Sequence, residues 1–151
     1  MSLVTLASRE SAQRGYEYYQ SKKVLSLCKL SDTEMTGTIK GSGNTHYEVF
    51  IDTLHPRKSK CNCPHADGKR IICKHIIALY FTAYPKEAEK FYDEVKLRKI
   101  EEEKRQEELE NKIIKFVKGL KKEELQNIIL DLLNDGPEWQ YDSFVDIYIE
   151  E

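Results

Sequence analysis

Residues 61–77 read CNCPHADGKRIICKHII and join three cysteines and a histidine to the start of an apolar segment. The four residues form two pairs, Cys61 with Cys63 and Cys73 with His75, and nine residues separate the pairs. Three thiols and one imidazole are a ligand set of structural zinc sites, which are tetrahedral. We therefore predict that these four residues hold one structural Zn²⁺ ion, which organises the N-terminal half of the chain.

The spacing within each pair predicts the local backbone. In an extended segment, residues i and i+2 point to the same side, so Cys61 and Cys63 can reach one ion from the end of a strand. In a helix the same two side chains would lie about 200° apart and would not converge. From Cys73 onward the apolar pattern is helical, which places Cys73 just before the helix and His75 in its first turn. The start of a helix also favours the negative charge of a thiolate.

The cysteines and histidines of this half of the chain also allow other interpretations. A thiol oxidoreductase at Cys61 and Cys63 is the enzymatic alternative, but the common redox spacing has two intervening residues and neither pair has it. His65 competes with His75 as a ligand, and we expect it to be solvent-exposed or adjacent to the site. Cys28 stands alone in a predicted strand, and we expect it to be a small buried apolar side chain.

Upstream of the cysteines, the pattern predicts one helix followed by three antiparallel strands. Ser8 is a suitable N-cap for a helix over residues 9–21. Residues 24–30, 35–40 and 46–52 alternate between apolar and polar side chains, as half-buried strands do, and short turns separate them. Residues 54–72 have no periodicity, and a metal site is the usual way to hold a loop of that length.

The second half of the chain is predicted to be helical. Helices are expected over residues 86–118 and 122–134, and a further short one within residues 139–148. Residues 101–108 contain no apolar side chain, so this stretch should be solvated on all sides. We predict an α+β protein with an N-terminal helix, a small β-meander and a zinc knuckle leading into a helix. The expected domains are a zinc module at residues 1–84, a long charged linking helix at 85–118 and a small helical tail at 119–151.

Composition and charge narrow the class of protein. No apolar run approaches the roughly 20 residues that a membrane span needs, and residues 1–5 do not resemble a signal peptide. Clustered cysteines without an export signal favour a cytoplasmic protein with no membrane association. Residues 1–84 carry 12 basic and 7 acidic side chains, whereas residues 85–151 carry 12 and 19. We expect different partners for these two parts.

A basic cluster surrounds the predicted zinc ligands and is opposed locally by Asp67 alone. The cluster consists of Arg57, Lys58, Lys60, Lys69, Arg70 and Lys74. Such a patch on a rigid loop can contact phosphates of nucleic acid, although lysines near thiolates also serve only to balance their charge. Tyrosines can add base stacking, but those on apolar helix faces usually belong to the core. The tyrosines in question are Tyr16, Tyr18, Tyr19 and Tyr80.

Cys61-Asn62-Cys63 and Cys73-Lys74-His75 together resemble the SWIM zinc finger. Arg14-Gly15-Tyr16-Glu17-Tyr18-Tyr19 and the predicted meander are also similar to SWIM proteins, so the resemblance covers roughly residues 8–84. SWIM modules occur in bacterial Swi/Snf-type ATPases, plant Mutator-type transposases and some kinase-associated ligases, and the family is predicted to bind DNA or proteins. This sequence has no GxxxxGK[ST] motif, so an associated ATPase would have to lie elsewhere.

These observations predict a non-enzymatic zinc module that binds nucleic acid, DNA in the first instance, through the basic cluster. The acidic helical tail is expected to contact a protein partner, and no small-molecule substrate is expected. The alternative is a protein–protein adaptor whose basic loop meets an acidic partner, without nucleic-acid binding. Four protein ligands fill a tetrahedral site, so the zinc is expected to support the fold and to perform no reaction.

Overall fold

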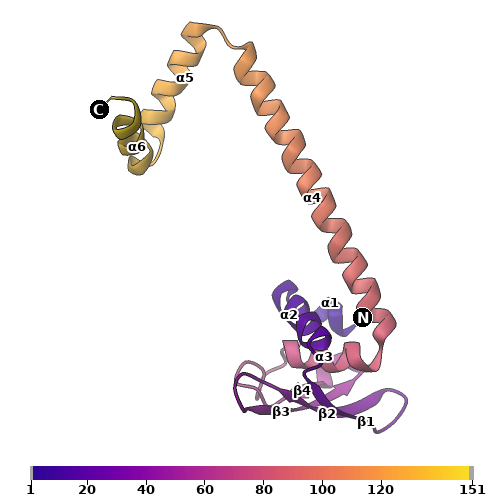
Figure 1. The fold of residues 1–151 in the computed structure, drawn as a ribbon. Helices are drawn as coiled ribbons and strands as arrows, with labels where there is room; N and C mark the ends of the chain where they lie inside the picture. Colours follow the sequence, from indigo (N-terminus) through magenta and orange to yellow (C-terminus); the bar gives the residue numbers. More distant parts are fainter. Residues whose placement is uncertain (1, 150–151) are drawn as a thin grey trace. The chain divides into compact units, whose positions relative to one another are not determined.

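A computed structural model describes residues 2–149 and confirms the α+β class (Figure 1). Four strands and a short 3₁₀ turn lie within the first half of the chain, and long helices make up the second half. In chain order the elements are α1 (Leu3–Leu6), α2 (Arg9–Gln20), β1 (Val24–Lys29), β2 (Glu34–Lys40), β3 (His46–Asp52), η1 (Pro56–Lys58), β4 (Lys60–Cys61), α3 (Lys74–Ala83), α4 (Pro85–Gly119), α5 (Lys122–Asp135) and α6 (Glu138–Tyr148).

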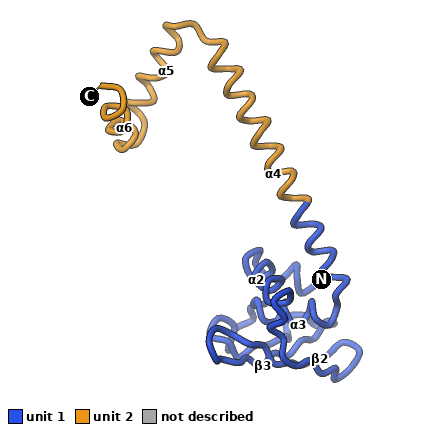
Figure 2. The backbone as a smooth tube through the Cα atoms, viewed as in Figure 1, with its two compact units in different colours: residues 1–96 blue, residues 97–151 orange. Residues whose placement is uncertain are grey.

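The chain forms two compact units, residues 1–96 and residues 97–151 (Figure 2). The first unit contains the sheet, α1 to α3 and the beginning of α4. The second contains the remainder of α4, together with α5 and α6. No helix within residues 2–149 combines the length and the apolarity that crossing a membrane requires.

The sheet is antiparallel with the strand order β1-β2-β3-β4. The three predicted strands are confirmed, and their alternation sends Met35, Val49 and Ile51 into the core. The fourth strand is a two-residue segment inside residues 54–72, where the sequence has no periodicity. It pairs Cys61 with Val49 of β3, so the zinc loop begins as an extension of the sheet.

Helix α3 is the centre of the first unit because α2 and the sheet pack against it from different sides (Figure 1). Its residues 75–81 are all buried, which is the behaviour of a helix that is covered all round. Two glycines allow the close approach. A β-carbon at Gly15 of α2 would lie 2.5 Å from the β-carbon of Ile77, and one at Gly37 of β2 would lie 2.6 Å from a methyl carbon of Leu79.

The core also includes residues from the two ends of the first unit. Leu3 is 1% exposed and comes from the short helix α1, whose N-cap is Ser2. Ala88 and Phe91, from the first turns of α4, join the same buried cluster. Tyr16 of α2 stacks on Tyr92 at 5.7 Å between ring centroids, so the start of α4 is fixed to α2.

In the second unit, neither α5 nor α6 contains a buried residue. The two helices contact each other, and Phe144 and Tyr148 of α6 place their ring centroids 5.1 Å apart. Large apolar side chains stay exposed along all three helices of this unit, among them Ile113, Phe116 and Trp139. The helices are those the periodicity predicted, and Gly136 follows the last residue of α5.

One prediction about the strands is wrong. Cys28 in β1 is exposed, although a buried apolar role was expected for it. The reason is that Cys28 lies on the outer face of the sheet, whereas the neighbouring Leu27 turns toward the core, as Val24 does.

Candidate metal centre

The end of one strand and the start of one helix bring the predicted ligands together. Cys61 is the last residue of β4, and Cys63 follows two positions later, where the chain bends. Cys73 is the N-cap of α3, and His75 lies in the first turn of that helix, as the spacing predicted. The strand end and the helix start therefore face each other across the zinc loop, residues 62–72.

The zinc loop is held by backbone and side-chain hydrogen bonds. Asn62, between the first two cysteines, accepts the backbone N–H of Glu48 at 2.9 Å and donates its own backbone N–H to the Glu48 carbonyl at 3.2 Å. After Cys63 the chain turns, because the Cys63 carbonyl accepts the N–H groups of Ala66 and Asp67. Gly68 has a φ of +68°, a conformation that glycine adopts without steric cost.

The ligand atoms have the spacing of a tetrahedral site. The three Sγ atoms and a ring nitrogen of His75 all lie within 4.8 Å of one another. Nδ1 of His75 is 3.6 Å from Sγ of Cys61 and 3.9 Å from Sγ of Cys73. With Zn–S near 2.3 Å and Zn–N near 2.0 Å, a tetrahedron has S···N edges of about 3.5 Å. The cluster accordingly fits one Zn²⁺ bound through Nδ1.

Burial and charge explain why this cluster suits a cation. All four ligands are at most 4% exposed. The pKa of the Cys73 thiol is lowered, first by a hydrogen bond from Cys61, whereas the same bond raises the pKa of Cys61. Burial, and then the charge of Cys73, raises the pKa of Cys63. One ionised sulfur therefore disfavours the ionisation of the other two thiols. A divalent cation at the centre removes this repulsion, because it attracts all three thiolates.

Aromatic rings enclose the histidine ligand. The Tyr47 ring stacks on His75 at 4.6 Å between centroids, and the Tyr18 ring meets it edge-on at 5.4 Å. These contacts orient the imidazole so that Nδ1 faces the sulfurs. Its other nitrogen, Nε2, is buried and has no hydrogen-bond partner within the described residues.

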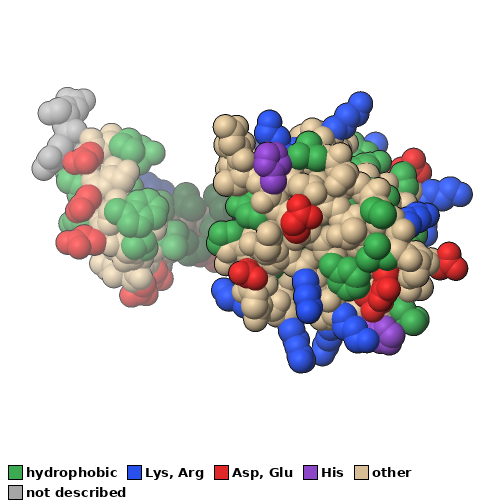
Figure 3. Space-filling model, turned by 90° about the horizontal axis from the view of Figure 1, so that it is seen from below, with side chains coloured by type: hydrophobic (Ala, Val, Ile, Leu, Met, Phe, Trp, Pro, Cys, Tyr) green, Lys and Arg blue, Asp and Glu red, His purple; other side chains and the backbone are tan. Residues whose placement is uncertain are grey.

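Five of the six predicted basic residues line one groove. Arg57, Lys58, Lys60, Lys69 and Arg70 surround an open groove of about 1090 Å³ that lies over the outer face of β2 and β3 and beside Cys61. All five side chains are exposed, and none makes an ion pair with an acidic side chain within residues 2–149. We call this feature the basic groove. In Figure 3, which views the molecule from the sheet side, lysine and arginine side chains project around the edge of the face.

Two acidic residues and one aromatic ring also line the basic groove. Glu48 and Asp67 are the acidic ones, so the cations remain in excess. Phe50 is half-buried in β3 opposite Lys60. The sequence analysis does not name Phe50 as a candidate for nucleic-acid contact. Its place in β3, where it alternates with the buried Val49 and Ile51, indicates that it faces outward.

The structure places the other candidates elsewhere. Lys74 is the first residue of α3 and lies apart from the basic groove, with its ammonium 4.6 Å from the centroid of the Tyr18 ring. His65 is exposed and is not part of the ligand cluster. The tyrosines weighed for base stacking pack into the interior instead, with Tyr18 and Tyr80 each 9% exposed and Tyr16 and Tyr19 packed against the core.

Comparison with known proteins supports the identification of the metal centre. Residues 47–84 match the family model for the SWIM zinc finger. The match begins in β3 and ends just after α3, so it includes all four ligands and the basic groove's five cations. No curated protein and no solved structure matches the chain.

Proposed function

We propose that the first unit of this chain, whose residues 47–84 match the SWIM zinc finger, is a structural zinc module that binds nucleic acid in the basic groove. The zinc site has four protein ligands and therefore no open position for water or substrate. In this proposal the ion holds the groove in shape and carries out no reaction, and the chain is not an enzyme.

The observation that carries the proposal is the convergence of five cations on one groove. They come from two segments, the η1–β4 region and the end of the zinc loop, and the pairing of β4 with β3 and a shared zinc ion would both hold these segments in place. Unpaired lysines and arginines along a groove are the usual footprint of phosphate contacts, each of which releases counterions. The half-buried Phe50 ring among them offers a surface for a base.

The second unit has the properties of a protein-contact segment in this proposal. Its helices carry exposed apolar side chains, including Leu130, Leu132 and Trp139, which a partner would cover. Its acidity, with no basic residue after Lys122, disfavours contact with a phosphate backbone.

The alternative is an adaptor in which the basic groove receives an acidic protein segment. The exposed apolar side chains of the second unit favour this adaptor role as much as they favour a nucleic-acid module whose tail contacts a protein. A site that accepts any flexible polyanion would bind poly-glutamate as tightly as an oligonucleotide of equal charge. A nucleic-acid site would prefer the oligonucleotide, because Phe50 can stack on bases and has no such partner in poly-glutamate.

The deciding experiment is a fluorescence anisotropy titration of the zinc-loaded chain. Labelled double-stranded DNA, single-stranded DNA and single-stranded RNA are compared with labelled poly-glutamate at low and at physiological salt. Nucleic-acid binding that weakens linearly on a log–log salt plot supports the proposal. Absence of binding to every nucleic acid at low salt, in protein shown to contain zinc, rejects it, and binding of poly-glutamate alone assigns the adaptor role.

A further inference from the structure

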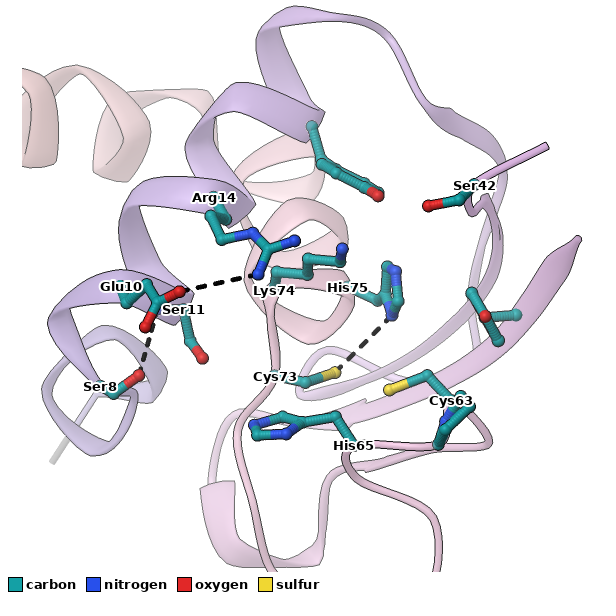
Figure 4. A pocket seen from close by; sticks show the side chains of 13 residues that line it. Ser8, Glu10, Ser11, Arg14, Ser42, Cys63, His65, Cys73, Lys74 and His75 are labelled. Atoms are coloured by element: carbon teal, nitrogen blue, oxygen red, sulfur yellow. Dashed lines mark hydrogen bonds and ion pairs between the residues drawn. The ribbon is translucent and has the colours of Figure 1, made fainter.

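A second cavity, of about 320 Å³, lies beside the zinc ligands at the N-terminal ends of α2 and α3 (Figure 4). Its lining comes from one face of α2 as far as Tyr18, from the start of α3, from the beginning of the zinc loop and from Ser42 and Tyr47. Cys63, Cys73 and His75 form part of its wall. The cavity is separate from the basic groove, because the two share no lining residue.

The buried Nε2 of His75 is the reason to expect a ligand in this cavity. His75 is 3% exposed, and Nε2 has no hydrogen-bond partner within the described residues. Because Nδ1 faces the sulfurs and would bind the zinc, the proton of the neutral imidazole must reside on Nε2. A buried N–H without an acceptor carries its full desolvation cost, so an oxygen atom supplied from the cavity would stabilise this arrangement.

The remaining polar lining consists mostly of donors. Figure 4 shows the side chains of Arg14 and Lys74 extending on the same side as the His75 ring. The hydroxyl of Ser8 accepts the N–H of Ser11 at 3.1 Å, which leaves the Ser8 O–H free to donate. The N-terminal ends of α2 and α3, helices of 12 and 10 residues, add positive potential.

The charges of the cavity lining balance, and one further cation lies nearby. Glu10 is the acidic residue in the lining, and it forms an ion pair with Arg14 at 3.7 Å. A zinc ion with three thiolates carries a net charge of −1. Arg14 and Lys74 balance these two negative charges. Lys23 is not a lining residue, but its ammonium lies 4.2 Å from the centroid of the Tyr18 ring, which is one, and adds a positive charge nearby.

We propose that this cavity binds a phosphate group, with the Nε2–H of His75, the ammonium of Lys74 and the guanidinium of Arg14 donating to its oxygens. Side-chain donors on two helices, one of them a buried imidazole, suit a tetrahedral oxyanion that accepts hydrogen bonds in several directions. The cavity is larger than one phosphate, so the group can belong to inorganic phosphate, to a nucleotide or to the end of a nucleic-acid strand. The proposal does not depend on nucleic-acid binding in the basic groove.

The test uses the full zinc-loaded chain and follows the Nε2–H resonance of His75 by ¹H–¹⁵N NMR during titration with inorganic phosphate. A saturable shift of that resonance, with slower exchange of the proton, is the expected result. In Arg14→Gln and in Lys74→Gln the phosphate affinity should fall about tenfold, the effect of one charge-assisted hydrogen bond. Lys69→Gln removes the same charge from the basic groove and should leave the phosphate affinity unchanged.

The outcome that overturns the proposal is an Nε2–H resonance that does not respond to millimolar phosphate, or that responds equally in the Arg14 and Lys74 variants. Two further titrations identify the source of the phosphate. A 5′-phosphorylated oligonucleotide that binds more tightly than its 5′-hydroxyl counterpart assigns the cavity to a strand end. A nucleoside 5′-monophosphate or free phosphate that binds as well as the phosphorylated strand assigns it to a small molecule. If the basic groove does not bind nucleic acid, the 5′-hydroxyl oligonucleotide will not bind, and this result is distinguishable from a failure of the cavity to bind phosphate.

Discussion

Gly15 in α2 lies against Ile77 in α3, so close that a β-carbon on Gly15 would stand 2.5 Å from that of Ile77. The carbonyl oxygen of Lys74 would lie 2.9 Å from the same added atom. Because Ile77 and His75 share one helix, the packing of α2 helps to set the position of the histidine ligand.

We expect Gly15→Ala to destabilise the first unit by about 1–3 kcal/mol, the usual cost of overpacking a core. The loss should appear although alanine is the better helix former by about 1 kcal/mol. Urea unfolding of the zinc-loaded protein measures it. Gly119→Ala is the matched control, since nothing lies within 4 Å of a β-carbon there, and it should be neutral or slightly stabilising. Equal stability of the two variants would contradict the close packing of α2 on α3.

Metal analysis should find one zinc per chain, because the cluster of Cys61, Cys63, Cys73 and His75 is complete. Cys73→Ala should lower the content towards zero and unfold the first unit, since zinc binding contributes of order 10 kcal/mol in comparable sites. Cys28→Ser is the control for losing a thiol, because Cys28 is exposed and outside the cluster. Retention of zinc in Cys73→Ala, or its loss in Cys28→Ser, would be incompatible with the proposed ligand set.

Zinc affinity should rise with pH, with a slope that reports about two protons released for each zinc ion bound. Without metal, the raised pKa values of Cys61 and Cys63 keep those thiols protonated near neutral pH, whereas the lowered pKa of Cys73 leaves it ionised. Zinc must then displace about two protons, so its apparent dissociation constant should fall about a hundredfold for each pH unit gained. The gain ends once the pH passes the raised pKa values. Competition with a chromophoric chelator at several pH values measures the slope, and a slope of three protons would show that Cys73 is protonated as well.

The basic groove makes a quantitative prediction about salt. If all five cations contact phosphates of double-stranded DNA, the log–log slope of affinity against salt should approach about −4.5. Arg57→Gln combined with Arg70→Gln should reduce its magnitude by about 2 and weaken binding for every sequence alike. Lys29→Gln combined with Lys40→Gln removes the same charge from β1 and β2, outside the groove. An equal change of slope in both double variants would mean that general charge, and not the groove, governs binding.

A chain that ends at residue 96 should fold and bind zinc as the full chain does. Every member of the buried cluster, and every apolar side chain packed against it, lies within residues 3–95. The zinc content and the urea midpoint of this shortened chain are therefore expected to match those of the first unit in the full chain. A shift of the midpoint by more than the experimental error would reveal stabilisation from residues 97–151.

Sequence reasoning reached the metal ligands because zinc imposes strict rules on residue type and spacing. Cys61 and Cys63 required an extended backbone, and Cys73 with His75 required a helix start, and the structure has both. The helices and the three longer strands followed from periodicity and from the Ser8 cap. Each of these features is local, so a short stretch of sequence contains the information that defines it.

The features that sequence reasoning missed depend on contacts between residues that are far apart in the chain. Leu3 looks unremarkable in its own segment, yet it is buried because α1 packs into the core. Helical spacing marks Phe91 as apolar, but only the fold shows that the core of the first unit covers it. Cys28 is exposed because it lies on the outer face of the sheet, and the loose alternation of apolar residues in β1 does not reveal which face is buried.

Residues 61–77 thus determined by themselves which residues bind the metal and what backbone presents them. The tertiary structure decided what surrounds that site. It gathered five cations of the basic cluster into one groove and placed Lys74 with Arg14 at a second cavity. It also left Nε2 of His75 buried without a partner. The physical reason is that coordination geometry acts over a few bonds, whereas the assembly of a groove or a cavity requires the sheet, α2 and α3 to be packed together.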